Sequence, residues 1–135
     1  MLKTEVMEKP AKNILVIDDD KLVLKTLAKY LKNCGYSVTV ASSGLEALDK
    51  IDISPEVPDL IISDVRMPGI NGIETLRKIQ GRIRSNNKTI PAIIITGYAG
   101  DESYHQEEGI GITDYLYKPF EIDEFIKIVK KNTEP

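Results

Sequence analysis

Short apolar segments alternate along the chain with longer amphipathic segments. Five apolar runs of strand length predict strands at Ile14–Ile17, Val38–Ala41, Leu60–Ile62, Ile93–Ile95 and Tyr115–Tyr117. Apolar residues at helical spacing predict five helices, at Lys21–Asn33, Ser43 to about Ile51, Gly72 to about Ile83, Asp101 to about Glu108 and Glu121–Lys131. Strand and helix therefore alternate five times.

The predicted helices differ in the strength of their apolar faces. The first carries a continuous stripe and stops at Gly35, a residue suited to the left-handed conformation that ends helices. In the second, we expect Leu45, Leu48 and Ile51 to face inward. The helix at 101–108 has little apolar surface and is the weakest of the five predictions.

The third and fourth strands, DLIIS and AIIIT, are almost unbroken apolar runs. Strands of this kind are covered on both faces, which is typical of a parallel sheet with helices on each side. A chain of 135 residues has the length of one such domain. Open parallel sheets place their chemistry outside the carboxyl ends of the strands, so this edge is where a site is expected.

Polar side chains follow four of the five strands at that edge. Asp18, Asp19 and Asp20 follow the first strand, Asp64 the third, Thr96 the fourth and Lys118 the fifth. Carboxylates gathered in one crevice cannot all stay ionised without a cation. Carboxylate oxygens suit Mg²⁺, so the pattern predicts a magnesium site with ligands from Asp19 and Asp64.

The remaining groups favour phosphoryl chemistry. Lys118 offers a positive charge and Thr96 a hydroxyl, the groups that stabilise the oxygens of a transferring phosphoryl group. The turn after the first strand holds acids where a nucleotide-binding fold would place glycines, which argues against a bound nucleotide. A carboxylate is itself a nucleophile toward phosphorus, so Asp64 becomes the predicted acceptor.

The segments ILVIDDD, LIISDVRMPGINGIETL, IIITGYAG and DYLYKPF, in this order and with the helices between them, resemble the response-regulator receiver family over residues 13–131. The resemblance implies an α/β fold of the flavodoxin-like, doubly wound type, with a five-stranded parallel sheet in the order 2-1-3-4-5 and five helices. It implies a phosphorylation-activated signalling domain rather than an enzyme, with Mg²⁺ as its cofactor.

The resemblance also implies roles at the metal site. Asp64 resembles the phosphoacceptor and Asp19 the direct metal ligand. Asp18 resembles the acid that holds the metal through water, and Arg66 the residue whose backbone carbonyl completes the coordination. Asp20, by contrast, has a plain explanation as the N-cap of the first helix.

Other positions match the family's switch. Thr96 resembles the switch hydroxyl and Tyr115 the switch aromatic. Lys118 matches the lysine that pairs with the phosphoryl oxygens, and the Lys118–Pro119 bond matches a cis peptide in the family. Arg66 and Tyr98 are both large at positions that flank the path of the hydrolytic water, and we hypothesise that they lengthen the lifetime of the phosphoryl group.

The expected partners follow from the same resemblance. A sensor histidine kinase or a phosphotransfer protein would donate the phosphoryl group. An output domain or downstream protein would bind the face formed by the helix at 101–108, the last strand and the last helix, and phosphorylation could drive homodimerisation. A net charge of −3 with mixed signs argues against direct nucleic-acid binding, and no apolar run is long enough for a membrane span, so we expect a cytoplasmic protein.

Two rival functions are weighed against this one. Haloacid-dehalogenase-like phosphatases also form an aspartyl phosphate, but they need a second acid two residues after the nucleophile, where this chain has Arg66. A receiver-like module that binds partners without being phosphorylated would not need the acids, Thr96 and Lys118. We expect an N-terminal tail at 1–12, the receiver at 13–131 and a tail or linker start at 132–135, in either a stand-alone protein or part of a longer one.

Overall fold

The computed structural model describes residues 10–54, 56–83, 89–98, 100 and 110–134. Its strands are β1 (Asn13–Ile17), β2 (Ser37–Ala41), β3 (Leu60–Asp64), β4 (Ala92–Thr96) and β5 (Ile112–Tyr117). Its helices are α2 (Lys21–Asn33), α3 (Gly44–Ile53), α4 (Gly72–Arg82) and α5 (Ile122–Thr133). The strands form one sheet in the order β2-β1-β3-β4-β5, and every neighbouring pair is parallel. The predicted strand order is therefore confirmed.

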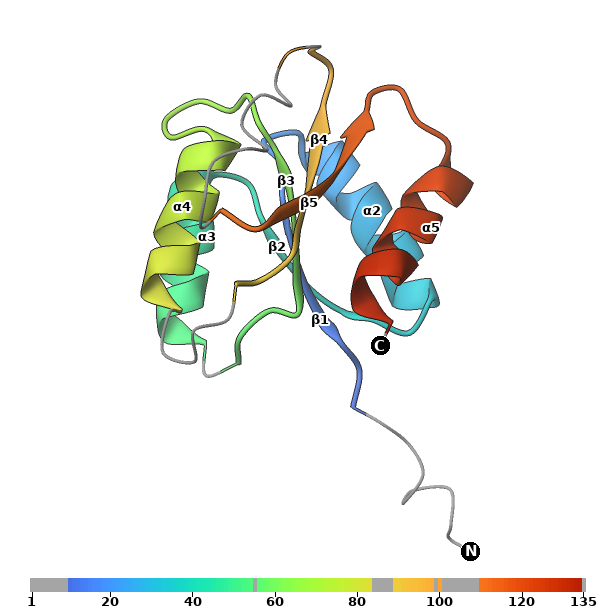
Figure 1. The fold of residues 1–135 in the computed structure, drawn as a ribbon, viewed down its shortest axis with the longest axis horizontal. Helices are drawn as coiled ribbons and strands as arrows, with labels where there is room; N and C mark the ends of the chain where they lie inside the picture. The colour runs from blue at the N-terminus through green and yellow to red at the C-terminus, as the bar shows by residue number, and fades with distance from the viewer. Residues whose placement is uncertain (1–9, 55, 84–88, 99, 101–109, 135) are drawn as a thin grey trace, which may run out of the picture.

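Helices cover both faces of the sheet. Figure 1 shows α3 and α4 on one face and α2 and α5 on the other. Because side chains alternate along a strand, each central strand feeds two cores. Leu15, Ile61 and Ile94 pack on the α3 and α4 side, whereas Ile62 and Ile93 pack on the α2 and α5 side. All residues of β3 and β4 are buried, as their apolar sequences predicted.

Side-chain caps fix the starts of three helices. Asp20 accepts hydrogen bonds from the backbone N–H groups of Leu22 and Val23, so it is the N-cap of α2. Ser43 and Asn71 cap α3 and α4 in the same way. These contacts satisfy backbone groups that a helix leaves unpaired at its N-terminus. The cap at Asp20 matters for function, because it sets the path of the chain between β1 and α2.

Three predictions about the helices need correction or lie outside the described residues. Leu48 is buried and Ile51 packs against the core as predicted, but Leu45 is 64% exposed, because the helix begins at Gly44 and buries Gly44 and Ala47 in its place. Helix α5 runs to Thr133, two residues past the predicted end, so the predicted tail at 132–135 begins within the helix. The predicted helix at 101–108 lies outside the described residues, and the part of the chain that the structure describes contains four helices rather than five.

The C-terminal end of α5 is held by side chains. The Thr133 hydroxyl lies 2.8 Å from the Tyr36 hydroxyl, just before β2, and is 3.0 Å from the Val129 carbonyl oxygen. Asn132 donates to Asp114 of β5 at 2.8 Å. The contact between Tyr36 and Thr133 joins residues 97 positions apart, so the helix boundary depends on tertiary structure. Among the described helices, none is long and apolar enough to cross a bilayer.

Gly72 is the point of closest approach between α4 and β3. Its N–H donates to the Val65 carbonyl at 2.8 Å, and a Cβ at this position would overlap the backbone carbonyl of Asp64. Gly81, in the same helix, is exposed and has open space around it. A glycine is therefore required at the first position and not at the second.

We expect Gly72→Ala to lower the free energy of unfolding by about 1–3 kcal/mol, because the added methyl group forces the helix away from the strand. Gly81→Ala is the matched control and should raise it by roughly 0.5–1 kcal/mol through better helix propensity. Urea unfolding followed by circular dichroism measures both. Equal stability of Gly72→Ala and wild type would contradict the close approach.

Candidate functional site

The carboxyl edge of the sheet gathers residues from four strands. Asp18 follows β1, Asp64 and Thr96 end β3 and β4, and Lys118 follows β5. Backbone hydrogen bonds extend the strand pairing through these positions. The Asp18 N–H donates to the Ala41 carbonyl at 3.1 Å, and the Lys118 N–H donates to the Thr96 carbonyl at 2.8 Å. The side chains therefore start from a regular, well-fixed edge.

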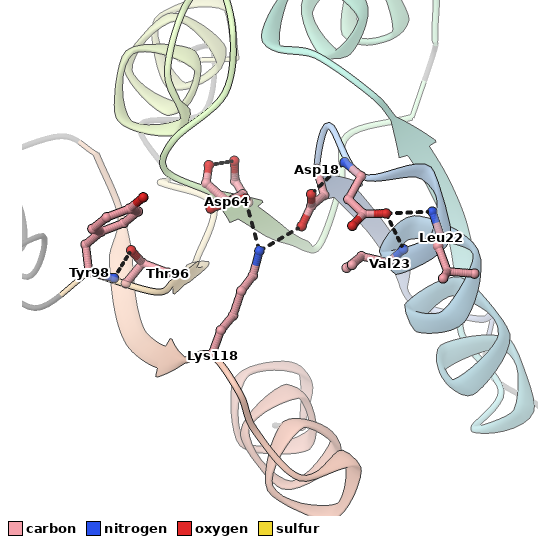
Figure 2. A network of polar contacts seen from close by, with 9 residues as sticks. Asp18, Leu22, Val23, Asp64, Thr96, Tyr98 and Lys118 are labelled. Atoms are coloured by element: carbon pink, nitrogen blue, oxygen red, sulfur yellow. Dashed lines mark hydrogen bonds and ion pairs between the residues drawn. The ribbon is translucent and has the colours of Figure 1, made fainter.

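The Lys118 side chain joins two of the acids. Its Nζ lies 3.1 Å from Asp64 Oδ2 and 3.6 Å from Asp18 Oδ2. Figure 2 shows this ammonium group between the two carboxylates, with Asp64 on one side and Asp18 on the other. Asp18 is 2% exposed and Asp64 is 9% exposed. Buried charges of this kind need a partner, and Lys118 supplies it.

Burial and charge act in opposite directions on these groups. Burial raises the pKa of Asp18 above its usual value, the nearby carboxylates Asp64 and Asp19 add to the rise, and the Asp20 N–H and Lys118 offset part of it. Burial alone would lower the pKa of Lys118, but attraction to Asp18 and Asp64 outweighs it and the pKa is raised. Lys118 therefore carries its charge at neutral pH, while the site as a whole has excess negative charge.

Three carboxylates are close enough to share a cation. One oxygen from each of Asp18, Asp19 and Asp64 lies within 4.8 Å of the others. An exposed acid and two buried ones, all with hard oxygen ligands, fit Mg²⁺, which binds few carboxylates and keeps several waters. Asp20 is turned away to cap α2, but its N–H donates to Asp18 Oδ1 at 2.9 Å and so orients that ligand.

Thr96 is the last residue of β4, and Tyr115 lies within the neighbouring strand β5. The Thr96 side chain is fully buried, and its hydroxyl accepts a hydrogen bond from the Tyr98 N–H at 3.1 Å. Figure 2 shows Thr96 and Tyr98 on the side of Lys118 away from Asp18. Tyr115 is partly buried and packs against the core under α3 and α4. Lys118 and Tyr115 therefore have different surroundings, as their odd spacing along the strand indicates.

Arg66 and Tyr98 form a contact that the sequence did not reveal. The Arg66 guanidinium carbon lies 4.1 Å from the centre of the Tyr98 ring, which is cation–π geometry. Arg66 comes two residues after Asp64, and Tyr98 comes two after Thr96. The stacked pair therefore bridges the loops that follow β3 and β4.

Sequence reasoning also missed two residues that position Asp64. Ser63 is fully buried, and its hydroxyl donates to the Asp64 carbonyl at 2.8 Å. Gly72 permits the same carbonyl to approach α4. A lone serine in an otherwise apolar strand was the available signal for the first. The Lys118–Pro119 peptide bond is cis.

The sheet order and the helices on both faces make this chain a flavodoxin-like α/β domain, with acids and a lysine at the carboxyl edge of its sheet. Comparison with known proteins gives its family. A family model described as the response regulator receiver domain matches residues 14–130. The chain belongs to the response regulator receiver domain family. It is a signalling domain of the kind found in two-component response regulators.

Curated relatives are a little more than one-third identical to this chain over the residues that align. The transcriptional regulatory protein ZraR of Klebsiella oxytoca is 38% identical over 111 residues, covering 82% of this chain and 24% of that protein. The response regulator MprA of Mycobacterium avium is 36% identical over 127 residues, covering 90% of this chain and 52% of that protein. The chain thus spans about a quarter to a half of the length of these relatives.

Solved structures show the same fold. A CheY-like receiver domain protein from Methanospirillum hungatei superposes with a TM-score of 0.78 at 29% identity, covering 92% of this chain and 94% of that one. The response regulator TrrA from Thermotoga maritima superposes with a TM-score of 0.69 at 34% identity, covering 90% and 98%. The TrrA structure is a complex with Mg²⁺ and BeF.

The substitution Asp18→Asn tests whether the negative charge of Asp18 lowers the stability of the folded domain. Since the pKa of Asp18 is raised in the folded state, its ionised form opposes folding above that pKa, and this penalty disappears as the pH falls through it. Asparagine lacks the charge but can still accept from the Asp20 N–H. We therefore expect a higher urea midpoint than wild type at pH 7 in EDTA.

With magnesium in place of EDTA, we expect wild type to have a higher urea midpoint than Asp18→Asn. Wild type gains stability by linkage, about 2.7 kcal/mol at a magnesium concentration of 100 Kd, and Asp18→Asn should gain much less. Asp49→Asn, an exposed acid of α3, is the control and should follow wild type in both buffers. A lower midpoint for Asp18→Asn in EDTA would show that Asp18 is not a source of destabilising charge.

Proposed function

We propose that Asp64 accepts a phosphoryl group from a phosphohistidine of a sensor histidine kinase or phosphotransfer protein. The observation that carries this proposal is the position of the Lys118 ammonium, 3.1 Å from Asp64 and 3.6 Å from Asp18. A carboxylate held beside a fixed cation can approach an anionic phosphoryl group with less repulsion than a free one.

The transfer exchanges one bond for another. An oxygen of Asp64 attacks phosphorus, a phosphorus–oxygen bond forms, and the phosphorus–nitrogen bond of the donor breaks with its electron pair leaving on the imidazole. Lys118 stays close to Asp64 and offers its ammonium to the oxygens of the transferred group. The hydrogen bond from Ser63 to the Asp64 carbonyl holds the backbone of the acceptor during this change.

Asp18, Asp19, Asp64 and the backbone carbonyl of Arg66 would hold Mg²⁺, which when bound offsets the negative charge of the acids and of the phosphoryl oxygens. This chain's residues fix the position of the ligands. Asp18 is held by the Asp20 N–H, and Asp64 by its place at the end of a fully buried strand.

Phosphorylation would then change a surface of the domain. The Thr96 hydroxyl turns toward the phosphoryl oxygens, and Tyr115 moves into the space that this leaves. The partly buried position of Tyr115 at the edge of the core supports such a movement. The altered face includes β5 and α5, with the predicted helix at 101–108, outside the described residues, as its expected third part, and it contacts an output domain, a downstream protein or a second copy of the chain. A full shift between two states needs about 5.5 kcal/mol of differential affinity.

Phosphorylation of Asp64 can be tested with a small donor. Acetyl phosphate and Mg²⁺ should add one phosphoryl group to wild type, as measured by intact mass, and none to Asp64→Asn because the amide is not a nucleophile. Asp49→Asn, which removes an exposed acid far from the site, should be labelled like wild type. Labelling of Asp64→Asn to the wild-type level would place the acceptor elsewhere.

The Arg66–Tyr98 stack should lengthen the lifetime of the phosphoryl group by limiting access of water. An exposed cation–π pair contributes about 0.5–1 kcal/mol, so Arg66→Ala should speed the loss of the phosphoryl group roughly two- to fivefold. Arg82→Ala removes an arginine that pairs with Asp52 at the far end of α4 and should leave the decay unchanged. Equal decay of wild type and Arg66→Ala would discard this role.

A further inference from the structure

One side of α2 carries an unbroken row of lysines. Lys21, Lys25, Lys29 and Lys32 are exposed, and the helix sequence KLVLKTLAKYLKN contains no acid. The other described helices are different. In α3, Glu46 pairs with Lys50 at 3.3 Å, and in α4, Glu74 pairs with Lys78 at 3.9 Å.

This row has an energetic cost for the isolated domain. Lys21 and Lys25, like Lys25 and Lys29, are four residues apart, the spacing at which like charges destabilise a helix. Across the described residues, no acid forms an ion pair with any of the four lysines. A chain with more acids than bases has therefore kept uncompensated positive charge on one surface.

The lysines border a groove with an apolar floor. The groove has a volume of about 770 Å³ and lies between α2 and the outermost strand β2. Leu24 and Ala28 of α2 and Val38 and Val40 of β2 line it, together with one acid, Glu46, whose charge is paired with Lys50. Both valines are only partly buried against the core, so apolar surface continues from the interior to this edge of the sheet.

The edge of β2 favours a helix over an added strand as the occupant. Strand addition would need the outward backbone groups of β2. The Val40 carbonyl already accepts a hydrogen bond from Lys50 Nζ at 2.5 Å, and Lys50 is held in place by Glu46. A helix would not need the backbone groups of β2, because its own backbone is already hydrogen-bonded. Acids at positions i, i+4 and i+8 of such a helix lie about 6 Å apart along its axis, which matches the spacing of Lys21, Lys25 and Lys29 along α2.

We propose that this groove binds an amphipathic acidic helix of a partner protein. The apolar face of that helix covers Leu24, Ala28, Val38 and Val40, and its acids pair with the lysines of α2. The apolar floor favours such a helix over a nucleic acid, which would meet the lysines but leave the floor exposed. The surface is distinct from Asp64, and its binding does not depend on phosphorylation.

The probe is a displayed library of helical peptides about four turns long, selected on the folded domain with the Lys25→Glu/Lys29→Glu double variant as counter-selection. We expect enriched peptides to carry acids at i, i+4 and i+8 beside an apolar stripe. Binding of the best peptide, labelled for fluorescence anisotropy, should weaken at least about tenfold in the double variant.

Two further variants separate this surface from general effects. Lys127→Glu/Lys130→Glu makes the same charge change on exposed positions of α5 and should alter affinity less than about twofold. Val38→Thr keeps the shape of the floor, removes apolar surface and should weaken binding several-fold. Circular dichroism and labelling by acetyl phosphate check that all variants stay folded.

The proposal is overturned if no peptide is enriched, or if enriched peptides lack acids or bind the Lys25→Glu/Lys29→Glu variant as well as wild type. It is also overturned if a single-stranded oligonucleotide displaces the peptide at lower concentration than the peptide itself. Self-association of wild type in sedimentation, lost in the same double variant, would make a second copy of the chain the occupant instead.

Discussion

The ammonium group of Lys118 between the carboxylates of Asp18 and Asp64 is the interaction on which the rest of the site depends. Both acids are buried, and burial of a charge without a partner opposes folding. Lys118 offsets part of this cost, but burial, with a smaller contribution from the carboxylates of Asp64 and Asp19, still raises the pKa of Asp18 above its usual value. Three carboxylates beside one ammonium leave negative charge in excess, which favours a cation at this edge of the sheet.

The strand order explains why a lysine holds this position. β1 and β3 are neighbours, so Asp18 and Asp64 meet directly at their ends. β5 is separated from β3 by β4, a distance of about 9–10 Å between strand axes. A long, flexible side chain is needed to cross that distance from Lys118 to Asp64. Thr96 ends the intervening strand, and the stacked Arg66 and Tyr98 lie on the loops that follow β3 and β4.

Positive and negative side chains gather on different surfaces of this domain, although its net charge is only −3. Acids collect at the carboxyl edge of the sheet, and lysines collect on α2. Asp20 connects the two, because its N–H orients Asp18 while its side chain caps the helix that carries the lysines. One turn of chain after β1 therefore joins the acidic edge of the sheet on one side to the lysine-lined groove on the other.

Local patterns determined the positions of the strands, the cap at Asp20 and the residues at the strand ends, because periodicity and capping act between residues close in sequence. They did not determine that α3 buries Ala47 rather than Leu45, since these two residues are distinguished only by what packs against the helix. The contacts of Thr133 with Tyr36 and of Arg66 with Tyr98 likewise join distant segments. Such contacts depend on how the elements are placed in space, and only the tertiary structure decides that.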